Sequence, residues 1–228
     1  MKNRYYFIDE SGDEEHFFLI ASILDNYDKA LSQINKGEND IRNSLLVDKF
    51  DKFKAFHASY DDLTIKTKFV ELLRLITYRS YIIIINKDKD FSKKQEKIYY
   101  ELFYCLAKDL LIKNEDKNNI FCFESCSTIK DDQAKKQYTK VVNKINEEYI
   151  KNKRTVKEIK FKVAIKGKEE KLLAISDYMG HIVLSNYEKN NKPIVKKFYK
   201  LLSSKIGMIR DITNNKFYSS KNPYKLID

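Results

Sequence analysis

The chain has 228 residues, of which 43% are hydrophobic and 34% are charged, and its formal net charge is +11 at pH 7. This length and composition are typical of a globular fold with one sizeable core, and 5 glycines and 2 prolines leave little room for linkers or low-complexity tails. The longest apolar run has the length of a strand, and the apolar stretch near the N-terminus is too short for a signal peptide. We therefore expect no membrane association and a cytoplasmic protein.

Residues 4–8 and 16–24 are rich in aromatic and β-branched side chains and are predicted to be strands. The segment between them is short and acidic, so the two strands are expected to form an antiparallel hairpin. Residues 28–44 have helical character, residues 52–59 are expected to form a short edge strand, and residues 64–79 carry an apolar stripe at helical spacing.

Strands and helices alternate in the next part of the chain. The run S-Y-I-I-I-I-N at residues 80–86 predicts a central strand, and residues 93–113 predict an amphipathic helix. A strand at residues 119–125, a polar outer helix at residues 131–151 and a strand with a lysine-rich outer face at residues 156–165 are expected to follow.

The last predicted elements are helices at residues 170–187 and 193–203, followed by an irregular aromatic tail from Met208. This order predicts an α/β fold whose mixed β-sheet begins with an antiparallel N-terminal hairpin and is flanked by helices. We expect a single domain over residues 1–228, in which about residues 190–228 form a basic helical extension.

The positive charge is concentrated towards the C-terminus. Residues 1–40 hold 4 Lys and Arg against 9 Asp and Glu, whereas residues 151–205 hold 15 against 5. A basic excess on one part of a fold is expected of a protein that binds a phosphate backbone, so we predict that the C-terminal third binds nucleic acid. The alternative is a composition rich in Lys, Asn, Ile and Tyr, as AT-rich coding produces. The three cysteines, Cys105, Cys122 and Cys126, are expected to be free thiols.

Three acidic residues occupy positions where acids are unusual. Asp9 ends the first predicted strand, Glu124 ends the strand I-F-C-F-E, and Asp177 borders the apolar face of the helix at residues 170–187. Clustered carboxylates repel one another unless a cation neutralises them, and oxygen ligands of this kind suit Mg²⁺ or Mn²⁺. A pair of such ions can clamp the attacking and leaving oxygens of a phosphodiester displacement.

Each acid also has a plain structural interpretation. The segment D-E-S-G could be a turn in which the glycine adopts a positive φ. Glu124 could pair with lysines, and Asp177 could face solvent. Because neighbouring strand residues point to opposite faces, Glu10 is either a further metal ligand across the strand end or the first residue of the turn.

The opening Y-F-I-D-E-S-G-D resembles that of the bacterial domain-of-unknown-function family 3800. The late-helix motif of that family, L-Q-x-A-D, has its counterpart in L-L-A-I-S-D, with Ser176 in place of the usual alanine. The family is similar to the ribonuclease H-like fold, which places acids on its first strand, its fourth strand and its final helix. The resemblance implies a ribonuclease H-like domain in which Asp9, Glu124 and Asp177 hold Mg²⁺ or Mn²⁺. It also suggests a mobile-element or phage-defence context.

Five other residues are candidates near this site. His57, in A-F-H-A-S, could be a catalytic proton carrier or phosphate ligand, or else a satisfied structural histidine. His181, four residues after Asp177, is expected to contact it. Lys166 and Lys168 could contact phosphate or lie in solvent. Glu71 is the candidate for an additional helix acid of the ribonuclease H type.

The sequence leaves three functions open. We favour a metal-dependent nuclease acting on DNA or RNA, with a basic surface that follows the phosphate backbone. The second is a non-catalytic nucleic-acid- or protein-binding module on the same fold. The third is a phosphatase or nucleotidase that uses the same acids on a small substrate.

Overall fold

The computed structural model describes residues 2–44, 55–125, 130–153, 159–167, 170–187, 193–219 and 222. The strands are β1 (Asn3–Gly12), β2 (His16–Leu24), β3 (Arg79–Asn86), β4 (Asn118–Glu124), β5 (Phe161–Lys166), β6 (Ile206–Asp211) and β7 (Lys216–Ser219). The helices are α1 (Tyr27–Ser44), α3 (Leu63–Leu75), α4 (Phe91–Ile112), α5 (Asp131–Lys153), α6 (Leu173–Tyr187), α7 (Pro193–Leu202) and a short 3₁₀ turn, Ser203–Lys205. None of the helices in these ranges is long and apolar enough to cross a membrane.

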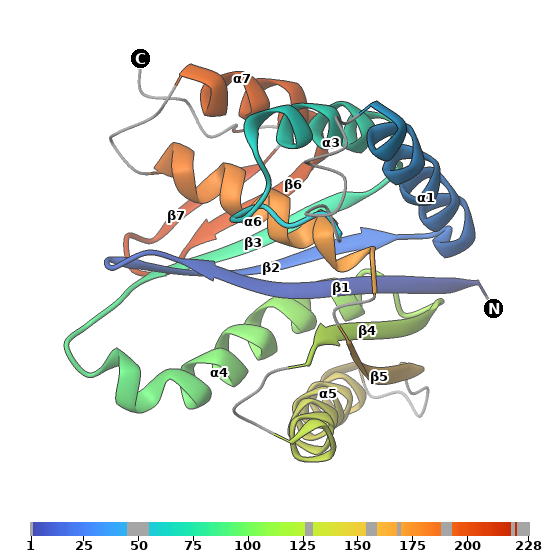
Figure 1. The fold of residues 1–228 in the computed structure, drawn as a ribbon. Helices are drawn as coiled ribbons and strands as arrows, with labels where there is room; N and C mark the ends of the chain where they lie inside the picture. The colour runs from blue at the N-terminus through green and yellow to red at the C-terminus, as the bar shows by residue number, and fades with distance from the viewer. Residues whose placement is uncertain are drawn as a thin grey trace.

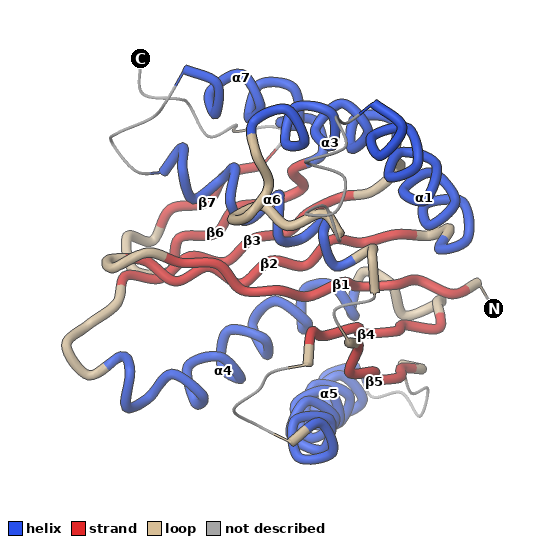
Figure 2. The backbone as a smooth tube through the Cα atoms, in the orientation of Figure 1, coloured by secondary structure: helices blue, strands red, loops and turns tan. Residues whose placement is uncertain are grey.

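The strands form one mixed sheet in the order β5-β4-β1-β2-β3-β6-β7. β1, β2 and β3 pair antiparallel, whereas β4 lies parallel to β1 and β5 lies parallel to β4. Figure 2 shows the strands of this sheet in red, with blue helices on both sides. At the other edge, β6 is parallel to β3 and antiparallel to β7. This arrangement confirms the predicted α/β fold with a mixed sheet that begins with an antiparallel hairpin and is flanked by helices.

The sheet separates two hydrophobic cores. Helices α1, α3, α6 and α7 cover one face, and α4 and α5 cover the other (Figure 1). Successive residues of β1 alternate between the cores: Phe7 packs on the α6 side, while Tyr6 and Ile8 pack on the α4 side. The near-continuous apolar run of β2 is explained by this coverage of both faces.

The first strand continues beyond Asp9, where the sequence predicts its end. β1 runs to Gly12, and the pairs Asp9–Ile20 and Gly12–Phe17 continue the hairpin ladder. A Cβ on Gly12 would lie 2.7 Å from the His16 carbonyl oxygen. Glycine at this position therefore lets the two backbone segments lie close together. No glycine in the described residues has a positive φ. The interpretation of D-E-S-G as a turn is therefore wrong.

The C-terminal region departs most from the prediction. Only α7 and the 3₁₀ turn are helical in the described part of residues 190–228, and the expected irregular tail from Met208 instead supplies β6 and β7. Ile206, Met208 and Ile209 are buried because β6 pairs with the open edge of β3. The region expected to be a helical extension thus completes the sheet.

Two predicted strands also differ. Residues 55–59 of the expected edge strand form a loop, and residues 52–54 lie outside the described residues. Strand β5 begins at Phe161, and residues 156–158 of that prediction are likewise not described. The backbone of Ile159 bonds instead to the side chain of Asn146 on α5, with N···O distances of 2.9 and 3.1 Å. Cys105 and Cys122 are free thiols, and Cys126 lies outside the described residues.

Candidate functional site

A cavity of about 1130 Å³ lies at the C-terminal ends of β1 and β4. Its basic lining residues are His57 and Lys171. Eight carboxylate side chains line it: Asp9, Glu10, Glu38, Asp61, Asp62, Glu124, Glu170 and Asp177. We call this space the acidic cavity.

Strand register brings Asp9 next to Glu124. Ile8 lies opposite Phe123 in the parallel β1–β4 pair, so the following residues are neighbours on strands about 4.8 Å apart. Phe7 and Cys122, two residues before each acid, belong to the core on the α6 side. Asp9 and Glu124 therefore point to the sheet face that α6 covers.

Two small residues hold α6 against β1 and bring Asp177 to the same place. The Ser176 hydroxyl donates a buried hydrogen bond of 2.7 Å to the Phe7 carbonyl oxygen. A Cβ on Gly180 would lie 2.8 Å from Ile20 Cδ1, so only glycine permits this approach without a shift. Ser176 thus fixes the helix to the strand. The acids occupy the first strand, the fourth strand and a late helix, which is the placement that the ribonuclease H-like resemblance implies.

Asp9 is buried among other negative charges. Its exposed fraction is 8%, and its carboxylate accepts a hydrogen bond of 2.9 Å from the Glu10 backbone N–H. Burial, followed by the charges of Glu10, Asp177 and Glu124, raises the pKa of Asp9 well above its ordinary value. No lysine or arginine of the described residues forms an ion pair with it. Within the described residues, ionised Asp9 therefore has no cation to neutralise it.

Glu10 lines the same cavity but belongs to the opposite face of β1. Its side chain retains solvent exposure and lies near Tyr99 on α4, whose hydroxyl bonds to it. Desolvation and then the charge of Glu124 raise the pKa of Glu10, while the Tyr99 bond opposes them. Glu10 is thus a neighbour of Glu124 around the end of the sheet.

The loop before α3 places His57 beside Asp177. The Ala58 backbone N–H donates to Asp177 Oδ2 at 2.7 Å. His57 Nδ1 lies 3.6 Å from the same oxygen, too far for a hydrogen bond, and accepts from the Ser59 N–H at 3.2 Å. Because Nδ1 accepts, the proton of neutral His57 belongs on Nε2 in this arrangement. The His57 side chain is 48% exposed, so it can meet a ligand.

Buried contacts hold this loop in place. Phe56 stacks on Phe69 with ring centroids 3.9 Å apart. Asp61 Oδ2 accepts hydrogen bonds from the His57 N–H at 2.9 Å and from the Tyr178 hydroxyl of α6. Desolvation raises the pKa of Asp61, and the Tyr178 and His57 hydrogen bonds oppose that rise. Asp62 caps α3 by accepting from the Ile65 N–H at 3.0 Å.

The sequence prediction missed four acids of the cavity. Asp62 precedes an apolar helical stripe, so its capping role had a visible signal. Asp61, Glu38 and Glu170 had none, since the contacts that bring them to the cavity from other elements are distant in the sequence. These contacts are made by Tyr178, Lys171 and Tyr27, respectively. Glu38 is 4% exposed and pairs with Lys171, and its Oε1 has no hydrogen-bond partner within the described residues.

The remaining predicted neighbours contribute less. Lys166 forms an ion pair of 3.3 Å with Glu170, and Lys168 lies outside the described residues. Among the residues described, no hydrogen bond joins His181 to Asp177; desolvation and then the charge of Lys66 lower the pKa of His181. Glu71 is exposed on α3 and does not line the cavity.

A divalent cation fits this site by donor chemistry. Asp9, Glu10, Glu124 and Asp177 offer only carboxylate oxygens, which Mg²⁺ and Mn²⁺ prefer. In the described part of the chain, however, no three His, Cys, Asp or Glu side chains converge closely enough to hold a metal ion. The acids are therefore neighbours without a closed coordination shell.

No protein-family model and no curated protein matches the sequence. Among solved structures, the chain is similar to the PCNA:RNase HII complex from Archaeoglobus fulgidus, with a TM-score of 0.40 and 10% sequence identity. The match covers 90% of this chain and 89% of that chain. A similarity of this size adds nothing about the function of this chain.

Proposed function

We propose that this chain is a nuclease that depends on a divalent metal and hydrolyses phosphodiester bonds of DNA or RNA. The observation that supports it most is Asp9, a buried carboxylate beside Glu124 and Asp177 to which no cationic side chain of the described residues is paired. Such a cluster is costly unless a cation joins it. The resemblance to domain-of-unknown-function family 3800 agrees with this proposal and suggests a role in a mobile element or in phage defence.

Asp9, Glu124 and Asp177 would hold Mg²⁺ or Mn²⁺, with Glu10 as a further ligand from the end of β1. The bound ion would polarise the scissile phosphate and lower the pKa of the attacking water. His57 would present its Nε2–H to a phosphate oxygen or to the leaving oxygen. The hydrogen bond from the Ala58 N–H to Asp177 and the bond that Asp61 accepts from the His57 N–H would hold the loop in a fixed position relative to the acids.

Nucleic acid would reach the site along lysines of the C-terminal third. Lys160 and Lys162 are exposed at β5, the edge strand that neighbours β4 and Glu124. Phosphate contacts of this kind depend on charge and not on base sequence, so binding would weaken steeply with added salt.

The second candidate is a non-catalytic binding module. One observation favours it: the carboxylates do not converge into a metal-binding group within the described residues. Such a module would bind nucleic acid through the same lysines and would not respond to Mg²⁺ or Mn²⁺.

Cleavage assays separate the two candidates. We expect the purified protein to cleave single- or double-stranded DNA or RNA with Mg²⁺ or Mn²⁺, and EDTA to abolish the cleavage. Asp9→Asn should remove the activity, whereas Asp40→Asn, an exposed aspartate on α1, should retain it. Metal-dependent cleavage that survives Asp9→Asn would refute the proposed site. Nucleic-acid binding without any cleavage would favour the module.

A further inference from the structure

A second hollow lies at the other end of the sheet. It has a volume of about 570 Å³ and is lined by the start of β1, the end of β2, the beginning of α1 and the end of α4. Arg4 lines this hollow and Asp9 lines the acidic cavity, and the five residue steps from Arg4 to Asp9 span about 17 Å of strand. The volume lies in the range of small-molecule sites.

Positive charge dominates its wall. Lys2, Arg4, Lys29, Arg79 and Lys113 line it together with one carboxylate, Asp25. We call this space the basic hollow. Its lining carries four more positive than negative formal charges, since five cations face one anion.

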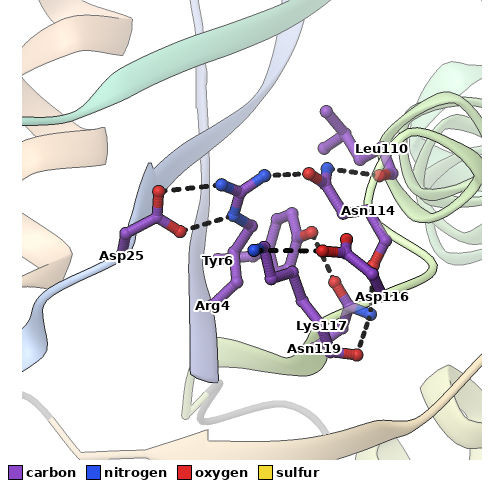
Figure 3. Close-up of polar contacts among 8 residues, drawn as sticks. All are labelled: Arg4, Tyr6, Asp25, Leu110, Asn114, Asp116, Lys117 and Asn119. Carbon is purple, nitrogen blue, oxygen red and sulfur yellow. Dashed lines mark hydrogen bonds and ion pairs between the residues drawn. The ribbon is translucent and has the colours of Figure 1, made fainter. Parts of the chain in front are cut away.

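The single carboxylate is already neutralised by Arg4. The Arg4 Nε and Nη2 atoms donate to the two oxygens of Asp25 at 2.6 and 2.8 Å, and Nη1 donates to Asn114 Oδ1 (Figure 3). This bidentate pair lowers the pKa of Asp25. Lys2, Lys29, Arg79 and Lys113 form no ion pair with any carboxylate of the described residues. Their charges are therefore left for a ligand.

The wall around Arg4 is fixed before any ligand binds. The Asn114 side-chain amide donates to the Leu110 carbonyl oxygen of α4 at 2.6 Å. Nearby, the Tyr6 hydroxyl donates to Asn119 Oδ1 at 2.6 Å, which joins β1 to β4 (Figure 3). A ligand would therefore meet a preorganised rim, which reduces the entropic cost of binding.

Two of these cations stand where other described parts of the chain disfavour positive charge. Lys29 stands in the first turn of α1, where the helix dipole disfavours a cation. Burial, followed by the charge of nearby Arg79, lowers the pKa of Lys205.

Other groups of the hollow suit the rest of a nucleotide. The half-buried Tyr81 supplies aromatic surface. Asn26 Oδ1 accepts from the Lys29 N–H at 3.0 Å, and Gln33 Nε2 donates to the Leu75 carbonyl at 3.4 Å. These bonds leave the amide donor of Asn26 and the amide acceptor of Gln33 for a ligand.

We propose that the basic hollow binds a phosphorylated small molecule of nucleotide size, with its phosphates between Lys29, Arg79 and Lys113. A nucleic-acid strand needs a track of successive phosphate contacts, whereas these cations surround one hollow. The hollow is separate from the acidic cavity, so the proposal does not depend on nuclease activity.

Calorimetry in EDTA tests the hollow with ATP, inorganic tripolyphosphate, adenosine and a short single-stranded oligonucleotide as probes. We expect ATP and tripolyphosphate to bind and adenosine not to bind. The double variant Arg79→Ala/Lys113→Ala, which changes two exposed side chains, should weaken both by at least about tenfold. Lys136→Ala/Lys140→Ala removes the same charge from exposed positions of α5 and should keep the wild-type affinity. Asp9→Asn should bind both anions normally.

Three results would overturn the proposal. The first is the absence of ATP and tripolyphosphate binding by the wild-type protein. The second is an equal loss of affinity in the two double variants, since net charge would then be the cause. The third is an oligonucleotide that binds more tightly than ATP and is lost in Arg79→Ala/Lys113→Ala, because the hollow would then be part of a nucleic-acid surface.

Discussion

The two ends of β1 carry opposite charge built in different ways. In the acidic cavity, Asp9 is buried on a central strand and Asp177 sits on a helix packed against it. In the basic hollow, Lys29, Arg79 and Lys113 are exposed, and Arg4 is neutralised by Asp25. Substituting a buried charged residue should therefore change both the function of the site and the stability of the fold. Substituting an exposed charged residue should change ligand binding with little effect on stability. Four experiments test this difference between the two ends.

The largest effect is expected from Asp177→Asn. Loss of one carboxylate from the acid cluster should lower metal-dependent cleavage by about 10²–10³-fold, the scale of losing one electrostatic contact to the reacting centre. Asp62→Asn is the matched control, because it removes a charge from the same cavity while asparagine still caps α3. Equal losses in both variants, measured as cleavage rates at saturating Mg²⁺, would show that cavity charge alone matters.

The next effect concerns the approach of α6 to β1. Gly180→Ala forces a Cβ to within 2.8 Å of Ile20 and 3.1 Å of Ser11, so we expect a loss of about 1–3 kcal/mol in the free energy of unfolding. Cleavage should fall as well, because Asp177 moves with the helix. Ser185→Ala, a half-buried position on the same helix, should be nearly neutral. Denaturant unfolding of both variants checks this, and a stable Gly180→Ala protein would contradict the packing.

The metal-free protein should lose stability as pH rises. The pKa of Asp9 is raised in the fold, so the folded state binds more protons than the unfolded state between the ordinary pKa of about 3.9 and the folded value. Stability contributed by protonated Asp9 is then complete below that window and disappears as pH rises through it. Glu10 and Asp61 shift in the same direction. Thermal unfolding measured in EDTA at several pH values should show that the stability of Asp9→Asn falls less steeply with pH than that of the wild type. An unchanged slope would show that Asp9 is not the group responsible.

The smallest effect is expected from Arg4→Lys at the basic hollow. Lysine cannot reproduce the bidentate pair with Asp25, yet that carboxylate is 43% exposed, so the loss should be about 1 kcal/mol or less. Thermal unfolding measures it, and Lys136→Arg on α5 is the control. A loss of several kcal/mol would show that substitutions at this end of β1 lower the stability as much as substitutions at the acidic end.

Apolar patterning accounts for most of the fold that the sequence predicts. The hairpin, the central strand β3 and the helices α4 and α6 follow runs of aliphatic residues whose periodicity survives in the structure. β6 escaped prediction because I-G-M-I-R-D is short and gains its stability from β3, more than 120 residues earlier. β1 extends past Asp9 because β2 continues to pair with it, which no local signal in D-E-S-G reveals.

The acidic cavity was predictable in part. Strand-end and helix-edge acids pointed to Asp9, Glu124 and Asp177, and these three do line one cavity. The hydrogen bond between Asp61 and Tyr178 was not predictable, since the two residues lie 117 positions apart in the sequence. Glu38 and Glu170 become cavity acids only through the packing of α1 against the segment before α6.

The central claim is that the acid cluster around Asp9 binds a divalent cation. Titration of Mn²⁺ into the metal-free protein by calorimetry tests it directly, with Asp9→Asn and the exposed control Asp40→Asn measured beside the wild type. We predict saturable binding to the wild type and to Asp40→Asn, a rise in their unfolding temperature with Mn²⁺, and loss of both effects in Asp9→Asn. The absence of Mn²⁺ binding at millimolar concentration, or equal binding by Asp9→Asn, would contradict the claim.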